Sequence, residues 1–177
     1  MYKPADSQSR LAIPTPFGLN LLVVLDDGGI VAAEFVPPSR HRRFTRTSDP
    51  LLREARAQVQ AYFRKRLIRF DLPLSLSGTP LELDVWRLVS SLSVGQIVSY
   101  GEVAGAIGRP SSHRGVAAAM SKTPIDLFVP AHRVIGSDGR IHGAVRGSLR
   151  HRLLQFEGYT IRRSGAVERA QSPRAHA

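Results

Sequence analysis

Residues 99–120 constrain the fold more than any other stretch of the chain. Ser99, followed three residues later by Glu102, forms a capping-box signature that predicts the start of a helix. The Gly-Arg-Pro tripeptide at 108–110 ends this helix, and one of the two serines at 111–112 is placed to cap a second one. Two short helices joined by a tight turn that contains glycine predict a helix-turn-helix.

The second of these helices has an unusual composition for a helix that reads DNA bases. Major-groove helices project arginine, asparagine, glutamine or lysine toward base edges. This helix offers Ser112, Gly115 and Ala117, with Arg114 as its single long basic side chain. Small residues allow close approach to a backbone or a narrow groove, which favours minor-groove docking with little sequence preference. The alternative is a small-residue helix packed tightly against a neighbouring helix.

The net charge favours the first of these two interpretations. The 177 residues carry 25 lysines and arginines against 14 aspartates and glutamates, which gives a formal net charge of +11. A basic balance of this size is typical of a chain with a polyanionic partner. An arginine-rich proteome is the alternative source of the excess, because arginine far outnumbers lysine.

The residue types that are present exclude several kinds of site. Without cysteine, the chain has no disulfide, no thiolate metal site and no thiol nucleophile. None of the histidines forms a helical i, i+4 pair beside a carboxylate, so we expect no metal and no cofactor. No apolar run approaches the ~20 residues of a membrane span, and no signal peptide is visible. These features predict a cytoplasmic protein without a membrane partner.

The N-terminal part of the chain predicts strands followed by a helix. Two apolar runs within 17–36 flank an Asp-Asp-Gly-Gly sequence, which supplies the positive φ angles of a hairpin turn. Asp49 and Pro50 then begin a helix with one apolar face as far as about Leu67. Residues 71–80 alternate like a short strand and end in a Gly-Thr-Pro turn, so we expect the domain junction at about residues 72–80.

The C-terminal part predicts a mainly helical domain over 78–160. Thr79 opens a helix that ends before Gly95, and the helix-turn-helix follows. A glycine-rich loop then leads to a further helix over about 149–156. Residues 161–177 are polar and basic without periodicity, so we expect them to form a flexible tail.

Four motifs together resemble the methylated-DNA–protein-cysteine methyltransferases, which repair O6-alkylguanine. These motifs are GTPLELDVWRLVSSL, VSYGEVAGAIGRPSSHRGVAAAM, PAHRVIG and LRHRLLQFEG. The resemblance covers about residues 17–160 and is specific in motif and spacing from 78 onward. It implies an α/β, RNase H-like domain over 1–77, followed by a mainly α winged-helix/helix-turn-helix DNA-binding domain over 78–160. Members of this family dock in the minor groove, flip the damaged guanine, and take its alkyl group onto the cysteine of a Pro-Cys-His-Arg motif.

At that cysteine position this chain has Ala131. The family's chemistry needs a thiolate, which a neighbouring histidine generates while a carboxylate orients that histidine. By the match these two partners are His132 and Glu157. Because the acceptor itself is missing, we do not expect an enzyme that transfers an alkyl group. The resemblance is to the alkyltransferase-like branch, whose members bind O6-alkylguanine without repairing it and mark it for other machinery.

The match also assigns residues to DNA binding and to the lesion pocket. Arg114 corresponds to the arginine that takes the place of the flipped base, and Tyr100 to the tyrosine that crowds the 3′ phosphate. Extrusion of a base costs a few kcal/mol, which a stacked guanidinium would partly offset. Minor-groove positions of the recognition helix fall at Ser112, Gly115 and Ala117. The lesion pocket would be lined by Met120, Ala131, Val134 and Val145.

The chain departs from the family pattern at two further places. Thr123 stands where the family commonly has asparagine before a proline. The glycine-rich loop lacks the usual tyrosine over the pocket and is apparently one residue shorter, which leaves the alignment open within 140–148. Several coordinated departures favour a natural homologue over a single engineered change at Ala131.

Three functions therefore remain as hypotheses. The first is a monomeric sensor that binds O6-alkylguanine in double-stranded DNA, with nucleotide excision repair proteins as downstream partners. The second is an active-site Cys-to-Ala variant of a true methyltransferase, and the third is a winged-helix transcription regulator. The small-residue recognition helix argues against the third, because direct readout of bases needs polar side chains.

Overall fold

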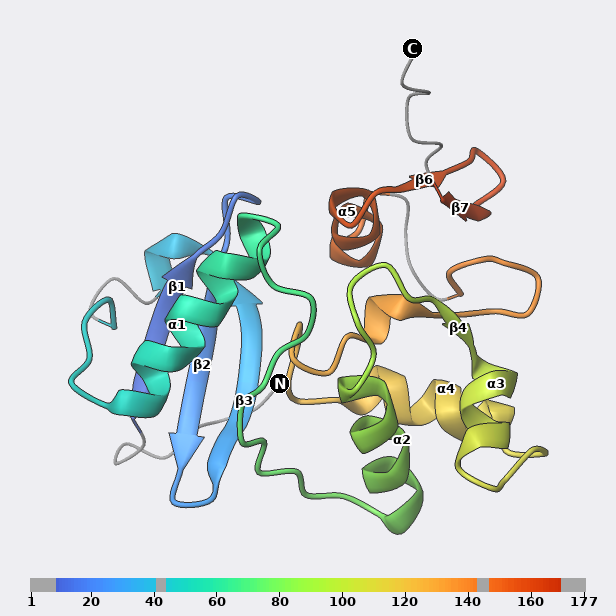
Figure 1. Cartoon of the computed structure of the whole chain (residues 1–177), viewed down its shortest axis with the longest axis horizontal. Helices are drawn as coiled ribbons and strands as arrows, with labels where there is room; N and C mark the ends of the chain where they lie inside the picture. The colour runs from blue at the N-terminus through green and yellow to red at the C-terminus, as the bar shows by residue number, and fades with distance from the viewer. Residues whose placement is uncertain (1–8, 41–43, 143–146, 170–177) are drawn as a thin grey trace.

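The computed structural model describes residues 9–40, 44–142 and 147–169. These residues form two halves, a sheet with one long helix and a cluster of shorter helices (Figure 1). One cluster of buried apolar side chains runs through both halves, from the strands and the long helix into the helical part. The predicted fold class, an α/β half followed by a mainly helical half with a helix-turn-helix, is confirmed.

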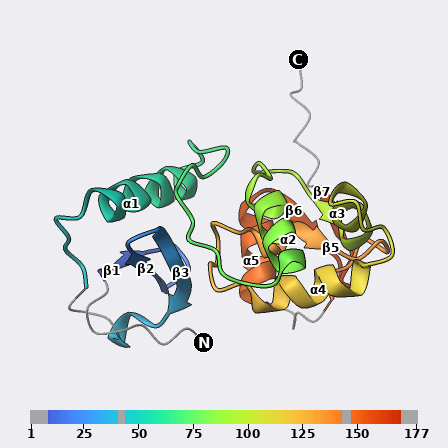
Figure 2. The same cartoon turned by 90° about the horizontal axis from the view of Figure 1, so that it is seen from below.

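The N-terminal half is a three-stranded antiparallel sheet with a helix across one face (Figure 2). Its elements are β1 (Arg10–Pro14), β2 (Asn20–Asp26), β3 (Gly29–Val36) and α1 (Pro50–Phe63). The predicted hairpin is confirmed, since β2 and β3 pair from Asn20–Val36 to Asp26–Gly29, with one register shift between Val24 and Leu25. β1 was not predicted, because its buried residues follow one another instead of alternating with exposed ones, and no period-2 signal arises.

Helix α1 begins as predicted and ends earlier. The Asp49 carboxylate accepts hydrogen bonds from the backbone N–H groups of Leu51 and Leu52, which caps the first turn. The helix stops at Phe63, and not near Leu67, because Lys65 adopts a left-handed backbone conformation with φ of 57°. A residue of this kind just after a helix reverses the chain and ends the helical hydrogen bonds.

The junction between the halves runs along the outer edge of β3. Residues 71–80 do not form the expected strand, and only Leu74 makes a bridge, parallel to Ile30. Farther along β3, Ala33 makes a second parallel bridge, with Ile125 from the helical half. Both segments therefore attach to the same sheet edge, and this edge fixes how the two halves meet.

The C-terminal half contains the helix-turn-helix. Its elements are α2 (Pro80–Ser90), β4 (Val98–Ser99), α3 (Tyr100–Ala106), α4 (His113–Lys122), β5 (Val134–Ile135) and α5 (Leu149–Phe156). The predicted starts of α2 and α3 are confirmed, because Thr79 and Ser99 each form a complete capping box. Ser112 does precede α4, but its side chain makes no capping hydrogen bond. Trp86 Nε1 donates to the carbonyl oxygen of Ala119 at 2.9 Å and ties α4 to α2.

The expectation of a flexible tail from residue 161 is wrong for its first part. Strands β6 (Tyr159–Ile161) and β7 (Val167–Arg169) form an antiparallel hairpin. Ile161 and Val167 pack against a small buried cluster that includes Leu154. Strands of three residues are too short to show a periodic pattern, so only packing reveals them. Within the described residues, every helix falls short of the length and apolar character that crossing a membrane requires.

Candidate functional site

Ala131 lies just after a mostly buried turn, in which the backbone N–H of Val129 donates to the carbonyl oxygen of Ile125 at 3.1 Å. The residues from Ile125 to Val129 run through the core, and Pro130 ends this run. Ala131–Arg133 then forms one turn of 3-10 helix that leads into β5. Ala131 is half-buried, whereas His132 and Arg133 are almost completely buried. A buried His-Arg pair needs partners, because burial of unpaired polar groups is costly.

Glu157, at the end of α5, supplies those partners. His132 Nε2 lies 2.9 Å from Glu157 Oε1. Arg133 donates to the same carboxylate from Nη2 to Oε1 at 2.7 Å, and from Nε to Oε2 at 3.0 Å and to Oε1 at 3.2 Å. The remaining arm of the guanidinium, Nη1, donates to the carbonyl oxygen of Leu92 at 2.6 Å. The phenol of Tyr62, on α1, donates to Glu157 Oε1 at 2.8 Å.

The protonation states in this network follow from burial and hydrogen bonding. Burial by itself would raise the pKa of Glu157, but hydrogen bonds from His132 and Arg133 outweigh it and lower the pKa to about 2. Burial lowers the pKa of His132, so its ring is neutral at pH 7. Because an ionised carboxylate can only accept, Nε2 of the neutral ring carries the proton and donates it to Glu157. Burial, followed by the charge of Glu157, raises the pKa of Tyr62.

A histidine held by a buried carboxylate is an arrangement that activates a nucleophile next to it. Here the adjoining residue is Ala131, whose methyl group can neither lose a proton nor accept an alkyl group. The His132–Glu157 pair therefore helps to hold this loop in place, but the residue next to it has no atom that could react. Among the described residues, no group of three or more His, Asp or Glu side chains is placed to hold a metal ion.

An open cavity of about 140 Å³ lies beside Ala131. Met120 from α4 and His132 also border it, together with Phe35 from β3 of the N-terminal half. Of the residues expected around the lesion, Met120 and Ala131 line this cavity. Val134 is fully buried and is not among the described residues that line it. Val145 lies outside the described residues.

The residues expected to bind DNA lie on α3 and α4. Arg114 is the second residue of α4, and its side chain is exposed to solvent. Tyr100 begins α3 and is half-buried against the core, so it also has a packing role. A Cβ atom added at Gly115 would lie 2.8 Å from Leu81 Cδ2, so this glycine allows the close approach of α4 to α2.

The other two expected positions on α4 are partly accessible. Both Ser112, directly before the helix, and Ala117 are half-buried. Neither carries a long side chain, and the first turn of α4 contains no acidic residue. The first turn of α4 therefore presents the exposed Arg114 close to small side chains and carries no negative charge.

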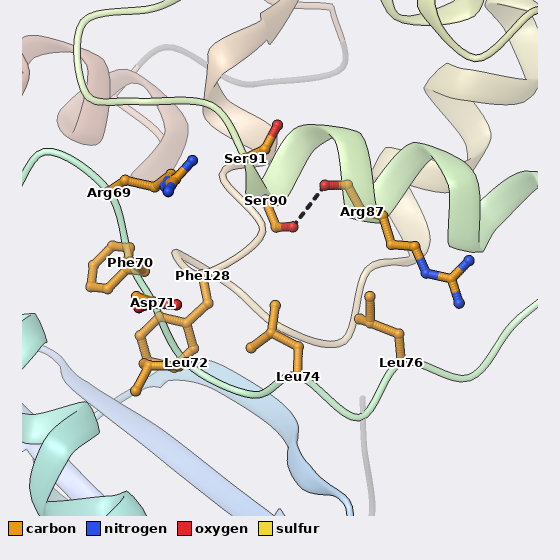
Figure 3. Close-up of a pocket in the computed structure, with 10 residues that line it drawn as sticks. All are labelled: Arg69, Phe70, Asp71, Leu72, Leu74, Leu76, Arg87, Ser90, Ser91 and Phe128. Atoms are coloured by element: carbon orange, nitrogen blue, oxygen red, sulfur yellow. Dashed lines mark hydrogen bonds between the residues drawn. The ribbon is translucent and has the colours of Figure 1, made fainter.

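A second, separate groove lies between the junction segment and α2. It has a volume of about 390 Å³, and the side chains of Leu74 and Leu76 point toward α2 in it (Figure 3). Arg69 and Arg87 lie at its borders. It has no described lining residue in common with the cavity beside Ala131, so the two are distinct.

Sequence reasoning missed four residues of the site. The sequence predicts Tyr62 only as part of the apolar face of α1 and Phe35 only as part of the hairpin, with no role for either at the site. Asp126 and Arg150, which both line the cavity beside Ala131, carried no local signal of their own. Each comes to the site through the tertiary arrangement of segments that are far apart in the sequence.

Known proteins resemble this chain over both halves. The ribonuclease-like domain of 6-O-methylguanine DNA methyltransferase matches residues 12–76, and the DNA binding domain of the same family matches residues 80–159. A methylated-DNA–protein-cysteine methyltransferase of Methanosarcina barkeri is 39% identical over 111 residues, which are 62% of this chain and 70% of the relative.

Solved structures resemble it as well. The crystal structure of Mycobacterium tuberculosis O6-methylguanine methyltransferase has a TM-score of 0.70 at 30% identity, over 85% of this chain and 92% of the other. A structure of Mycobacterium tuberculosis OGT in complex with DNA has a TM-score of 0.67 at 33% identity, over 84% and 91%. The chain belongs to the family of the 6-O-methylguanine DNA methyltransferases, and its sequence contains no cysteine to accept an alkyl group.

Proposed function

We propose that this protein binds O6-alkylguanine in double-stranded DNA and does not take up the alkyl group. The observation that carries the proposal is the environment of Ala131. The cavity beside it is open, and the His132–Glu157 pair behind it is complete, yet the position between them holds only a methyl group. Recognition of a flipped base depends on a cavity and on a surface that docks DNA, and neither depends on a thiol.

The docking surface in this proposal is α4 with the turn that precedes it. Arg114 is exposed at the start of the helix and is the residue we assign to the space left by the flipped base. Close approach of a small-residue helix suits the minor groove, and the net charge of +11 favours a polyanion over any neutral partner. Tyr100, at the start of α3, is assigned to the phosphate beside the target nucleotide.

The hydroxyl groups at the cavity do not replace the missing thiol. Ser121 donates its hydroxyl to the carbonyl oxygen of Ala118 at 2.8 Å, and Thr123 accepts from the backbone N–H of Ile125. An alcohol needs a base within hydrogen-bond reach to become a nucleophile. In the described part of the chain neither hydroxyl is hydrogen-bonded to a ring nitrogen of His132, so neither is paired with that base.

Binding without chemistry leaves the lesion in the DNA. The bound complex therefore has to be acted on by other proteins, and we propose that it marks the site for nucleotide excision repair. Extrusion of the base and the wedge at Arg114 would distort the duplex, and such a distortion is a signal that a repair system can read without contacting the lesion itself.

A competition binding assay tests the proposal. One labelled duplex with a single O6-methylguanine is displaced by unlabelled damaged or undamaged duplex of the same sequence at matched salt. We expect the damaged duplex to compete at least about tenfold better, and equal competition by the two duplexes contradicts the proposal. Arg114→Ala should remove most of this preference. Arg53→Ala, which removes an exposed arginine from α1 in the other half, should leave it in place.

The inactivated methyltransferase is the second candidate, and the complete His132–Glu157 pair favours it. Ala131→Cys separates the two candidates, because it restores the acceptor to an otherwise unchanged site. Rapid, stoichiometric transfer of a methyl group from O6-methylguanine to this variant would support the second candidate. Persistent inertness of a folded variant that still binds the damaged duplex would support the sensor.

A further inference from the structure

Two charged side chains line the cavity beside Ala131. A plain alkyl group bound there would make no hydrogen bond or ion pair with either of them. Arg150, the second residue of α5, and Asp126, in the segment attached to β3, both line this cavity. A site built only for methyl or ethyl groups gains nothing from a guanidinium, because such groups offer no hydrogen-bond acceptor.

Most of the N–H donors of the Arg150 guanidinium are not used in hydrogen bonds within the described part of the chain. Its Nη2 lies 3.5 Å from the carbonyl oxygen of Met120, at the long limit of a hydrogen bond, and within the described ranges this is its only hydrogen bond. A guanidinium has five N–H donors in a planar fork. The side chain is half-buried and lines the cavity, so the donors that the Met120 carbonyl does not occupy are available to a ligand bound there.

Asp126, in contrast, is hydrogen-bonded to strand β3 through both its carboxylate and its backbone. Its carboxylate accepts a hydrogen bond from the backbone N–H of Phe35, and its own N–H donates to the carbonyl oxygen of Ala33 at 2.7 Å. Its charge also faces that of Glu34 across the same sheet edge. Asp126 thus holds the segment against β3. In the described part of the chain no ion pair within 4.0 Å joins it to Arg150, although the charge of Arg150 is near enough to lower the pKa of Asp126 slightly against the larger effect of burial.

We infer that Arg150 forms a subsite for the far end of the O6 adduct, and that it selects adducts ending in a carboxylate or another strong acceptor over apolar adducts of equal size. The inference rests on the proposed function and deepens it. A guanidinium binds a carboxylate through charge-assisted hydrogen bonds, and in a half-enclosed site these are strong enough to change affinity by about tenfold. The methyl group of Ala131 leaves the space through which such an adduct reaches Arg150.

The test compares two adducts of matched size in one duplex. O6-carboxymethylguanine and O6-isobutylguanine each add the same number of non-hydrogen atoms with the same branching, but only the first ends in a carboxylate. Dissociation constants of the 177-residue protein are measured by fluorescence anisotropy for both, together with O6-methylguanine and unmodified guanine. We expect the carboxymethyl duplex to bind about tenfold more tightly than the isobutyl duplex.

Variants assign the preference to Arg150. Arg150→Met keeps an unbranched chain but removes the donors, so the ratio of the two dissociation constants should fall to about one, whatever happens to overall affinity. Arg53→Met, a matched loss of charge on α1, should keep the ratio near its original value. Asp126→Asn removes the opposing carboxylate from the cavity and should increase the ratio.

The outcomes separate this inference from the function on which it rests. A ratio near one in the unaltered protein, with O6-methylguanine still preferred over guanine, overturns the subsite and leaves the proposed function standing. A tenfold ratio that survives in folded Arg150→Met overturns the role of Arg150. Absence of preference for every O6-substituted duplex over guanine overturns both proposals.

Discussion

The phenol of Tyr62 donates a hydrogen bond to Oε1 of Glu157 across 95 residues of sequence. Tyr62 belongs to α1 of the N-terminal half, and Glu157 follows α5 at the end of the helical half. Through Glu157 the same contact reaches His132 and Arg133, the two residues that follow Ala131. The N-terminal half therefore helps to hold the loop that borders the cavity, in addition to its own sheet.

Tyr62→Phe should destabilise the protein by about 1.5–2 kcal/mol, because it removes a hydrogen bond to a charged acceptor and leaves the ring in place. Urea unfolding at pH 7.5 measures the change. Tyr159→Phe provides a matched control, since the Tyr159 phenol donates to the neutral carbonyl oxygen of Gly95 at 2.7 Å and its loss should cost less. An equal or smaller loss for Tyr62→Phe than for the control would argue against an ionised Glu157.

Glu157→Gln should lower the free energy of unfolding by about 3–5 kcal/mol at pH 7, because Arg133 stays buried without a countercharge. The pKa of Glu157 is lowered from 4.5 to about 2 in the folded protein, so its ionisation stabilises the fold above pH 4.5. This contribution, about 3 kcal/mol from the shift, is lost as pH falls toward 2. Unfolding curves of both proteins between pH 3 and 7 should therefore converge at the acid end, and parallel curves would contradict the network.

Asp126→Asn should raise the free energy of unfolding at neutral pH, whereas Glu157→Gln should lower it. Burial, followed by repulsion from Glu34, raises the pKa of Asp126 from 3.8 to about 6. The folded state then holds the proton more tightly than the unfolded chain, so the unaltered protein loses stability as pH rises from about 4 to 6. The loss is about 3 kcal/mol at most. The asparagine variant should be more stable than the parent at pH 7.5 and nearly equal at pH 4, as measured by thermal unfolding.

Affinity for the damaged duplex should fall steeply with salt. If the docking surface contacts about 4–6 phosphates, the logarithm of affinity falls against the logarithm of salt concentration with a slope of roughly −4 to −5. Anisotropy titrations between 50 and 200 mM salt measure this slope. Arg114→Ala should reduce lesion preference, and any change in slope should be close to one charge. A slope near zero would exclude phosphate contacts as the main source of affinity.

Local signals in the sequence predicted much of the fold. Capping boxes at Thr79 and Ser99 placed the starts of α2 and α3, because each box involves residues only three positions apart. The Asp49-Pro50 pair placed the start of α1 in the same way. The end of α1 was misplaced, since the left-handed conformation of Lys65 has no local sequence signal comparable to a glycine.

The sequence by itself predicted the hairpin of β2 and β3, the helix-turn-helix and the absence of a thiol, and the family resemblance paired His132 with Glu157. Tertiary structure alone decided which residues enclose the cavity, because Phe35, Met120 and Arg150 come from three elements that no periodic pattern connects. It also decided the attachment of Leu74 and Ile125 to β3. Such contacts depend on how packed segments meet in space, and side-chain periodicity records only which face of a segment is buried.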